Sequence, residues 1–316
     1  MKKEKILIFG AGAVGAYFGL KLHKKGYETV FACRGKIYEK IKTEGIILDS
    51  FTSGKEYFKN INIINSSQTD IFKNYKEYFD VVLFCVKSYD TEKSAEQISE
   101  TLKKNGVIIS LQNGVENEYI LSKIFGEENV PGAVVFIASS LENNNYLKHT
   151  GSGKITFGKM FKKYAEEKNF FLKKLFDDAE IDSSISENIL QNLWTKLVWN
   201  ASFNAVSVAL SATVMEMIES ENSLYLLRGA MREVILTAAA QGIKIDESII
   251  EKFLDRNTNI GEFKTSMLQD YEKGKKLEFE YLNGAVIRFA KKYNVPVPLN
   301  ESLYNILAFL DNRRNK

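Results

Sequence analysis

The stretch that decides the fold is KILIFGAGAVG, residues 5–15. Four of its first five residues are apolar, as in a strand covered on both faces, and a Gly-x-Gly-x-x-Gly turn follows at once. Gly10 permits the tight turn, Gly12 lets the backbone approach a diphosphate, and Gly15 allows the next helix to pack closely on the strand. That helix, predicted over 14–25, offers unpaired N–H groups and the positive end of its dipole to an anion. The predicted cofactor loop comprises Gly10, Ala11, Gly12, Ala13, Val14 and Gly15.

Short apolar runs and amphipathic stretches alternate through the first half of the chain. Further strands are predicted over 28–32, 80–87 and 107–111. A helix is predicted over 91–104, ended by Asn105-Gly106. Strand–helix–strand repetition predicts a parallel, doubly wound sheet and argues against a glycine turn that merely packs. Residues 133–158 are typical of antiparallel strands appended to that sheet, and 181–185 of a last strand.

Beyond Glu187 the apolar residues recur with helical period. The predicted helices span 187–212, 221–241, 246–256, 260–271, 277–293 and 299–313. We therefore expect an α/β Rossmann domain over 1–186 and an all-α domain over 187–316.

Composition bounds the class of protein. A chain of 316 residues with 45% apolar and 26% charged residues suits two soluble domains. The net charge is only +3, and no long basic run indicates nucleic-acid binding. The uncharged stretch 6–20 resembles a secretory signal superficially, but Gly10, Gly12, Gly15 and Gly19 interrupt it at spacings that indicate another role. No other stretch is long and apolar enough for a membrane span. We expect a cytoplasmic enzyme, and both a monomer and a homodimer fit this composition.

The few cysteines and histidines exclude several kinds of site. Cys33 and Cys85 lie in apolar runs without metal-ligand spacing, so we expect buried thiols rather than a disulfide or zinc site. With only His23 and His149 present, neither a His-based metal site nor a Ser-His-Asp triad is expected.

The end of the second predicted strand bears on the choice of dinucleotide. NAD enzymes usually carry Asp or Glu there, but this strand ends in Arg34-Gly35-Lys36. A guanidinium can bind a 2′-phosphate through several charge-assisted hydrogen bonds, which favours NADPH. The alternative is that Arg34 is a solvated loop residue. Lys87 and Asn113 also follow predicted parallel strands, where doubly wound folds place ligands, although each alone is ordinary for a strand end or a turn.

A polar stripe marks the apolar helix LWTKLVWNASFNAVSVAL, residues 193–210. Lys196, Asn200 and Asn204 recur at intervals of four, within about 80° of one another on the helix, and Ser207 lies on the same stripe. Such a stripe indicates a ligand, a partner chain or an internal polar network, because buried lysine and mid-helix asparagine are costly. For a ketone substrate, the lysine can supply a proton, and the asparagines can position the carbonyl and hydroxyl groups.

A second polar cluster follows at 265–270 and 278–284, with Gly274 between two predicted helices. Ser266 could bind a carboxylate, and Glu278, in the first turn of a predicted helix, could pair with Lys196. Taken alone, a serine and a glutamate near helix ends are usually caps.

Together these residues resemble the ketopantoate reductase (2-dehydropantoate 2-reductase) family. The resemblance covers nearly the whole chain and rests on four motifs: GxGxxG at 10–15, Asn113-Gly114, LWxKLxxNxxxN at 193–204 and SMLQD…EFEYLNG at 266–284. The resemblance implies a Rossmann domain and a helical domain of the 6-phosphogluconate dehydrogenase-like type. It further implies NADPH-dependent reduction of 2-dehydropantoate to (R)-pantoate, in pantothenate and coenzyme A synthesis.

The resemblance also implies roles for particular residues. Lys196 matches the family's general acid, Asn200 and Asn204 its substrate-binding asparagines, and Ser266 the serine that meets the substrate carboxylate. Asn113 matches a residue near both nicotinamide and substrate.

The remaining matches concern the cofactor. Glu278 corresponds to an acid beside the cofactor and the catalytic lysine, and Arg34 and Lys87 to phosphate or adenosine contacts. Ala138, after the predicted strand AVVFI, corresponds to a backbone contact.

Two departures from the family pattern bear on the substrate. Val214 replaces a further asparagine that some members use, and Phe263 stands where the family often has a polar residue. Both changes predict a more apolar pocket wall. Reduction of another branched or bulkier 2-keto acid therefore remains an alternative, as does a non-catalytic NADPH-binding protein on the same fold.

Overall fold

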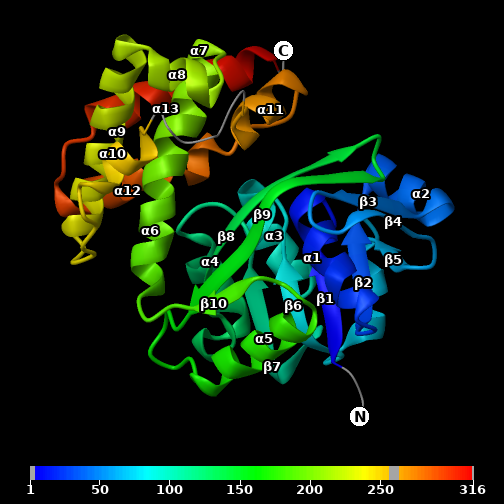
Figure 1. The fold of residues 1–316 in the computed structure, drawn as a ribbon. Helices are drawn as coiled ribbons and strands as arrows, with labels where there is room; N and C mark the ends of the chain where they lie inside the picture. The colour runs from blue at the N-terminus through cyan, green and yellow to red at the C-terminus, as the bar shows by residue number, and fades with distance from the viewer. Residues whose placement is uncertain (1–3, 256–262, 315–316) are drawn as a thin grey trace. The chain divides into compact units, whose positions relative to one another are not determined.

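The computed structural model describes residues 4–255 and 263–314 of the chain (Figure 1). The chain packs as two compact units. The first contains the residues up to Gln112 together with Asn117–Ile189, and the second contains Asn113–Glu116 together with the chain from Leu190 onward.

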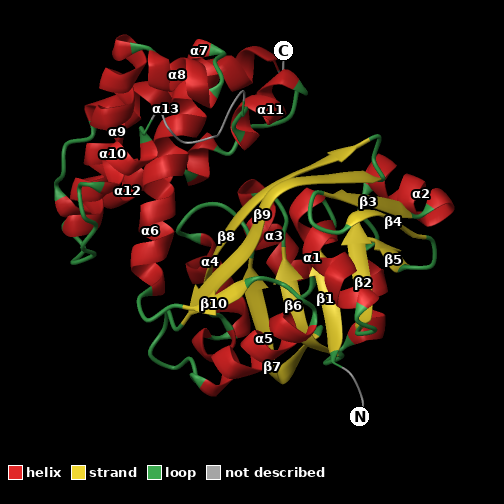
Figure 2. Ribbon diagram, in the orientation of Figure 1, coloured by secondary structure: helices red, strands yellow, loops and turns green. Residues whose placement is uncertain are grey.

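A five-stranded parallel sheet forms the centre of the first unit (Figure 2). Its strands, in the spatial order β5-β2-β1-β6-β7, are Asn62–Asn65, Glu28–Cys33, Lys5–Phe9, Phe79–Phe84 and Leu102–Ser110. In the register of the central pairs, Phe9 lies opposite Ala32 on one side and opposite Phe84 on the other. The predicted Rossmann-type domain is confirmed.

Alternate residues of β1 enter two separate cores, which explains why this strand is apolar throughout. Ile6 and Ile8 belong to the core formed with α1 (Ala13–Lys24) and α5 (Glu167–Asp178). Leu7 and Phe9 belong to the core on the opposite face of the sheet. That second core is formed with α3 (Thr91–Gln97), α4 (Asn117–Phe125) and the 3-10 turn η1 (Thr69–Tyr75). The unit also contains α2 (Gly35–Glu44), η2 (Ser88–Asp90) and η3 (Glu127–Asn129).

A second sheet takes up the strands that we expected to be appended to the first. Its strands are β3 (Ile46–Ser50), β4 (Gly54–Phe58), β8 (Gly132–Glu142), β9 (Tyr146–Gly158) and β10 (Ser183–Ile185). The antiparallel pairing of β8 with β9 agrees with the prediction, but β9 also pairs in parallel with β3 and β10. Inward residues of this sheet, such as Leu48 and Val135, enter the α1 core, so α1 packs against both sheets.

Two predicted boundaries in the first unit were wrong. Strand β6 ends at Phe84, so Lys87 lies in the following turn rather than in the strand. Helix α3 ends at Gln97 rather than near 104, because β7 begins at Leu102, where it pairs with Phe79 ahead of a bulge. The pairing of β7 with β6 therefore outweighs Asn105-Gly106, the turn sequence that was expected to end the helix.

Both thiols belong to the α1 core or pack against it. Cys33 is buried and Cys85 half-buried, and both are free. Burial raises the pKa of Cys33 to about 12 and raises the pKa of Cys85 as well, so both stay protonated near neutral pH.

Over the described residues of the second unit, the regular elements are all helices, as predicted. Its elements are α6 (Ile189–Trp199), the π-helix η4 (Asn200–Asn204), α7 (Ala205–Leu210), α8 (Val214–Glu219), α9 (Glu221–Ala239), α10 (Ile249–Phe253), α11 (Ser266–Glu272), η5 (Phe279–Tyr281), α12 (Asn283–Tyr293) and α13 (Pro298–Arg314). Helix α8 was not predicted, and the segment expected as one helix over 277–293 is a 3-10 turn followed by α12. Position 256 and positions 260–262 of the predicted helices lie outside the described residues. Over the described ranges, no helix has the length and apolar character needed to cross a membrane.

Candidate active site

The glycine loop has the geometry that a bound diphosphate requires. A Cβ on Gly10, whose φ is +97°, would lie 2.7 Å from the backbone of Cys85, and a Cβ on Gly15 would lie 2.5 Å from the carbonyl oxygen of Gly10. At Gly12 the same test finds no atom within 4 Å, so the space beside its backbone is open. Gly12 also caps α1 without a side-chain hydrogen bond, and the first turn of α1 carries no acidic residue. These residues fit a dinucleotide whose diphosphate rests on the α1 N-terminus.

Arg34 follows β2 directly and is the N-cap residue of α2. Its side chain is 65% exposed, and its Nη2 lies 2.7 Å from Oδ2 of Asp90. Asp90 is the N-cap residue of α3, so the ion pair joins the segments that follow β2 and β6, the two strands on either side of β1. The remaining guanidinium N–H groups face solvent, where they can donate to a phosphate.

The other two predicted cofactor contacts also lie in the first unit. Lys87 precedes the η2 turn, three residues after β6. Ala138 lies within β8 rather than after a strand, next to an irregularity in the pairing with β9. The contacts of both residues with a cofactor stay predictions.

The polar stripe of the second unit crosses a π-helix. We expected one continuous α-helix over 187–212, but Asn200–Asn204 forms a π-helix between α6 and α7. A four-residue step along an α-helix overshoots a full turn by about 40°. The wider π turn, whose hydrogen bonds span five residues, rotates less per residue and so reduces that overshoot between Asn200 and Asn204. Asn200 and Asn204 therefore still lie on one face of the helical segment.

Hydrogen bonds link three of the predicted site residues within the second unit. Nδ2 of Asn204 lies 3.5 Å from Oδ1 of Asn200, and Nδ2 of Asn200 lies 3.4 Å from Oδ1 of Asn113. Asn200 and Asn204 are 6% and 3% exposed. The bonds are long, so these amides can rotate towards the carbonyl, hydroxyl or carboxylate groups of a substrate at modest cost. Lys196, one turn before Asn200 on α6, is half-buried.

A buried polar network bonds to the backbone of the π-helix. Asn283, at the start of α12, is fully buried, and its Nδ2 donates to the carbonyl oxygen of Ala201 at 2.8 Å and to Oδ1 of Asn300 at 3.0 Å. Asn300 in turn donates to Oε2 of Glu233 on α9. Within the π-helix, Oγ of Ser202 donates to the carbonyl oxygen of Val198 at 2.7 Å. These bonds satisfy carbonyl groups where regular helical bonding is interrupted.

Ser266 is exposed at the start of a helix, whereas Glu278 is buried. Ser266 is the exposed first residue of α11, and the preceding Thr265 caps that helix by accepting a hydrogen bond from the N–H of Leu268. Ser207 of the stripe lies 2.6 Å from Oγ1 of Thr265, so it joins α7 to the start of α11. Glu278 is 8% exposed and precedes the η5 turn. Its pairing with Lys196 stays a prediction.

The two departures from the family pattern are neighbours. The N–H of Val214 donates to the carbonyl oxygen of Phe263 at 3.0 Å. Val214 is fully buried, whereas Phe263 is 37% exposed. Of the two, only Phe263 presents a substantial apolar surface outside the core.

The structure thus places the predicted site residues in two groups. The glycine loop, Arg34, Lys87 and Ala138 belong to the first unit, and Asn113, Lys196, Asn200, Asn204, Ser266 and Glu278 belong to the second. Sequence analysis included Thr265 and Asn283 in the second polar cluster without assigning them a role, and it missed Asn300, because a buried amide or hydroxyl has no periodic signal of its own. The apolar neighbours of Asn283 in the stretch 278–284 are the only sequence feature that indicates burial there.

Comparison with known proteins gives matches along nearly the whole chain. A family model described as "Ketopantoate reductase PanE/ApbA" matches residues 6–162, and one described as "Ketopantoate reductase PanE/ApbA C terminal" matches residues 188–311. The 2-dehydropantoate 2-reductase of Nostoc sp. is 30% identical and aligns over 99% of this chain and 97% of its own length.

Two solved structures are similar over the same extent. The 2-dehydropantoate 2-reductase of Geobacter metallireducens superposes with a TM-score of 0.89 at 29% identity, covering 96% of this chain and 99% of its own. A D-mandelate dehydrogenase, solved with NADH and anilino(oxo)acetate, gives a TM-score of 0.90 at 25% identity, covering 99% and 100%.

Proposed function

Because the chain belongs to the ketopantoate reductase family, we propose that it reduces 2-dehydropantoate to (R)-pantoate with NADPH, in cytoplasmic pantothenate and coenzyme A synthesis. The observation that carries this proposal is the polar row of Lys196, Asn200 and Asn204, with Asn113 hydrogen-bonded to it. A protein that only bound a dinucleotide would not need such a row in an otherwise apolar helix.

The residues of the second unit act on the ketone and its carboxylate. A bound reduced nicotinamide supplies the hydride that adds to the carbonyl carbon. The carbonyl oxygen then gains negative charge and takes a proton from Nζ of Lys196, a step that typically contributes about 10²–10⁴-fold. Asn200 and Asn204 hold the carbonyl and hydroxyl oxygens, and Ser266 donates to the carboxylate. Glu278 orients the lysine.

The residues of the first unit hold the cofactor. The glycine loop carries the diphosphate, and Lys87 and Ala138 contact the rest of the dinucleotide. Arg34 selects NADPH by donating several N–H groups to the 2′-phosphate, while Asp90 holds the guanidinium from its other side. The absence of an acid after β2 removes the usual partner of the NAD ribose.

A spectrophotometric assay of dinucleotide oxidation tests this proposal. We expect turnover with 2-dehydropantoate and NADPH, a lower kcat/KM with NADH, and a loss of about 10²-fold or more in kcat for Lys196→Ala with NADPH affinity retained. The control is Lys244→Ala, a lysine of the same unit outside the stripe. Near-normal turnover by Lys196→Ala would remove Lys196 as the acid. Tight NADPH binding without oxidation by any 2-keto acid would favour a non-catalytic binding protein.

The exposed Phe263 favours a second candidate, reduction of a bulkier or aromatic 2-keto acid. The similarity to a D-mandelate dehydrogenase solved with an aromatic oxoacetate supports it. The same assay decides between the two through the ratio of kcat/KM for 2-dehydropantoate to that for an aromatic 2-keto acid. In that second case Phe263→Ser should shift the ratio towards 2-dehydropantoate.

A further inference from the structure

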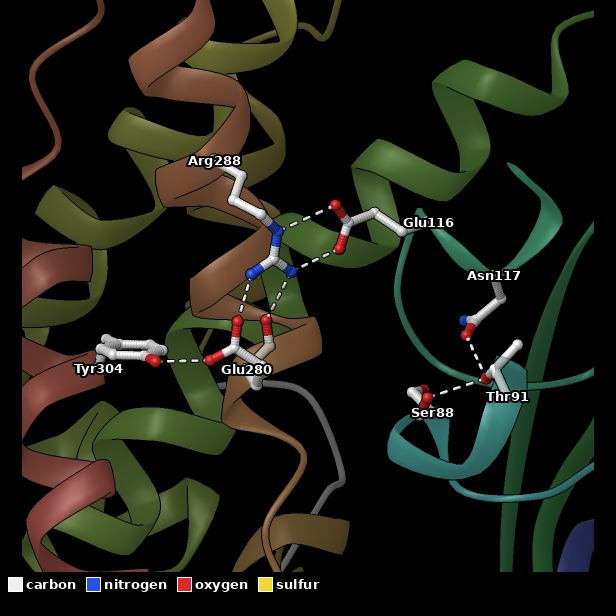
Figure 3. Close-up of polar contacts among 7 residues, drawn as sticks. All are labelled: Ser88, Thr91, Glu116, Asn117, Glu280, Arg288 and Tyr304. Atoms are coloured by element: carbon white, nitrogen blue, oxygen red, sulfur yellow. Dashed lines mark hydrogen bonds and ion pairs between the residues drawn. The ribbon is translucent and has the colours of Figure 1, made fainter. Parts of the chain in front are cut away.

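An ion-pair cluster in the second unit is centred on Arg288 and Glu280 (Figure 3). Arg288, on α12, meets Glu116 with both prongs of its guanidinium: Nε lies 3.1 Å from Oε1 and Nη2 lies 2.5 Å from Oε2. The same guanidinium pairs with the carboxylate of Glu280 and donates from Nη2 to the Glu280 carbonyl oxygen at 2.9 Å. Tyr304, on α13, donates to the other carboxylate oxygen of Glu280 at 2.5 Å. Two glutamates therefore meet at one guanidinium, and Tyr304 joins the cluster through Glu280.

The two carboxylates flank predicted site residues. Glu116 closes the short segment that begins at Asn113, and Asn113 accepts the hydrogen bond from Asn200. Glu280 lies two residues after Glu278, in the η5 turn. Arg288 thus connects the turn that carries Asn113 with the turn that carries Glu278.

The residue after Glu116 is anchored elsewhere. Asn117 is buried, and its Oδ1 accepts a hydrogen bond from Oγ1 of Thr91 at 3.0 Å, within the first unit (Figure 3). The same hydroxyl lies 2.9 Å from the carbonyl oxygen of Ser88, so its one proton is shared between the two acceptors. Adjacent residues of the chain therefore form side-chain bonds in different units, and the segment from Asn113 to Glu116 is bonded at its start to Asn200 and at its end to Arg288.

The cluster is suited to arginine rather than to lysine. Burial by itself lowers the pKa of Arg288, but the hydrogen bonds and charges of Glu116 and Glu280 raise it overall, so the guanidinium stays charged. Only the planar fork of arginine can satisfy one carboxylate with two parallel bonds and still reach a second carboxylate. A lysine would keep the charge but lose the geometry.

We propose that Arg288 is a positioning residue for the reduction: by clamping Glu116 and Glu280, it sets the place of Asn113 relative to Asn200 and Glu278. This inference rests on the proposed function, and it makes Arg288 necessary for turnover although it touches neither substrate nor cofactor. A displacement of about 1 Å at a reacting site can cost about 10²-fold in rate, so loss of the fork should lower kcat substantially.

The test compares Arg288→Lys with Arg228→Lys in the full-length enzyme. Arg228 is the matched control, because it forms an equally two-pronged pair with Glu251, at 2.9 and 3.0 Å, between α9 and α10 of the same unit. We expect Arg288→Lys to lower kcat by about tenfold to a hundredfold while the Kd for NADPH in the absence of substrate changes little. We expect Arg228→Lys to leave both unchanged.

Hydrogen exchange of the peptide that covers residues 113–116 gives a second readout, which does not depend on turnover. The backbone amides of this peptide should exchange faster in Arg288→Lys than in the wild type, and at the wild-type rate in Arg228→Lys. An Arg288→Lys enzyme with wild-type kcat overturns the proposal, and so does an equal loss of kcat in Arg228→Lys. If the wild type reduces no 2-keto acid, the proposed function fails, and the exchange rates alone then decide whether Arg288 holds this segment.

Discussion

Replacing Asn283 by alanine should destabilise the helical unit without touching any substrate-facing residue. The side chain is fully buried and donates to the carbonyl oxygen of Ala201 at 2.8 Å and to Oδ1 of Asn300 at 3.0 Å. The substitution removes two hydrogen bonds, each of which contributes about 0.5–1.5 kcal/mol net to stability. It also leaves two buried acceptors without this donor, and each acceptor that stays unsatisfied costs about 1–3 kcal/mol. Because neighbouring groups relax in part, we expect a net loss of about 2–4 kcal/mol in the free energy of unfolding.

The two tryptophans of the chain make this loss measurable in the right unit. Trp194 and Trp199 both lie on α6, and Trp199 stacks on Phe203 of the π-helix with ring centroids 3.9 Å apart. Their fluorescence in an equilibrium urea titration therefore reports the helical unit. With a urea m-value of about 2 kcal/mol per molar, the midpoint should fall by about 1–2 M.

Asn305→Ala provides the matched control. Its Nδ2 donates to the carbonyl oxygen of Glu301 at 2.8 Å on the exposed face of α13, so we expect a change of less than about 0.5 kcal/mol. If Asn283→Ala lowers the midpoint no more than Asn305→Ala does, the buried network does not hold the π-helix, and the reasoning fails.

Three further predictions concern the first unit. Gly12→Ala should leave the melting temperature unchanged, since the new Cβ meets no atom within 4 Å, but it should weaken NADPH binding in a fluorescence titration. Gly10→Ala should lower the melting temperature, because φ at this position is +97° and the new Cβ would lie 2.7 Å from backbone atoms. Arg34→Ala should reduce the ratio of kcat/KM for NADPH to that for NADH by about tenfold or more, since a hydrogen bond to a charged group contributes about 1.5–3 kcal/mol; an unchanged ratio would show that another group selects the cofactor. Burial lowers the pKa of His149, so its contribution to stability is complete above the unfolded pKa of about 6.5 and is lost as the pH falls through the lower folded pKa. The melting temperature should therefore fall between about pH 7.5 and about pH 5.5, and by less in His149→Gln; an equal fall in that variant would exclude His149 as the cause.

The features that the sequence predicts best are those with local causes. Strand β1 has the predicted bounds, Lys5–Phe9, because an apolar run and a glycine turn define both of its ends. The start of α3 at Thr91 was also predicted, but its end was not, since pairing of β7 with β6 decides where that helix stops.

Features that depend on distant partners could not be predicted. No periodicity in the sequence marks the π-helix at Asn200–Asn204, and this helix is supported by Asn283, 82 positions from Ala201 along the chain. The pair of Glu116 with Arg288 joins residues 172 positions apart. The periodicity of Lys196, Asn200 and Asn204 indicates a polar row, but it does not show that Asn113 joins it.

The pair of Glu116 and Arg288 also limits the order in which the two units can finish folding during synthesis. The segment Asn113–Glu116 is synthesised well before the helices with which it packs, and its arginine partner follows 172 residues later. At about 5–20 residues per second, that segment waits about 10–30 s for Arg288 to be made. The parallel sheet can form during this interval, whereas the helical unit can close only after α12 has left the ribosome. A gene fragment that starts at Leu190 would lack Glu116 and would always leave the Arg288 cluster incomplete.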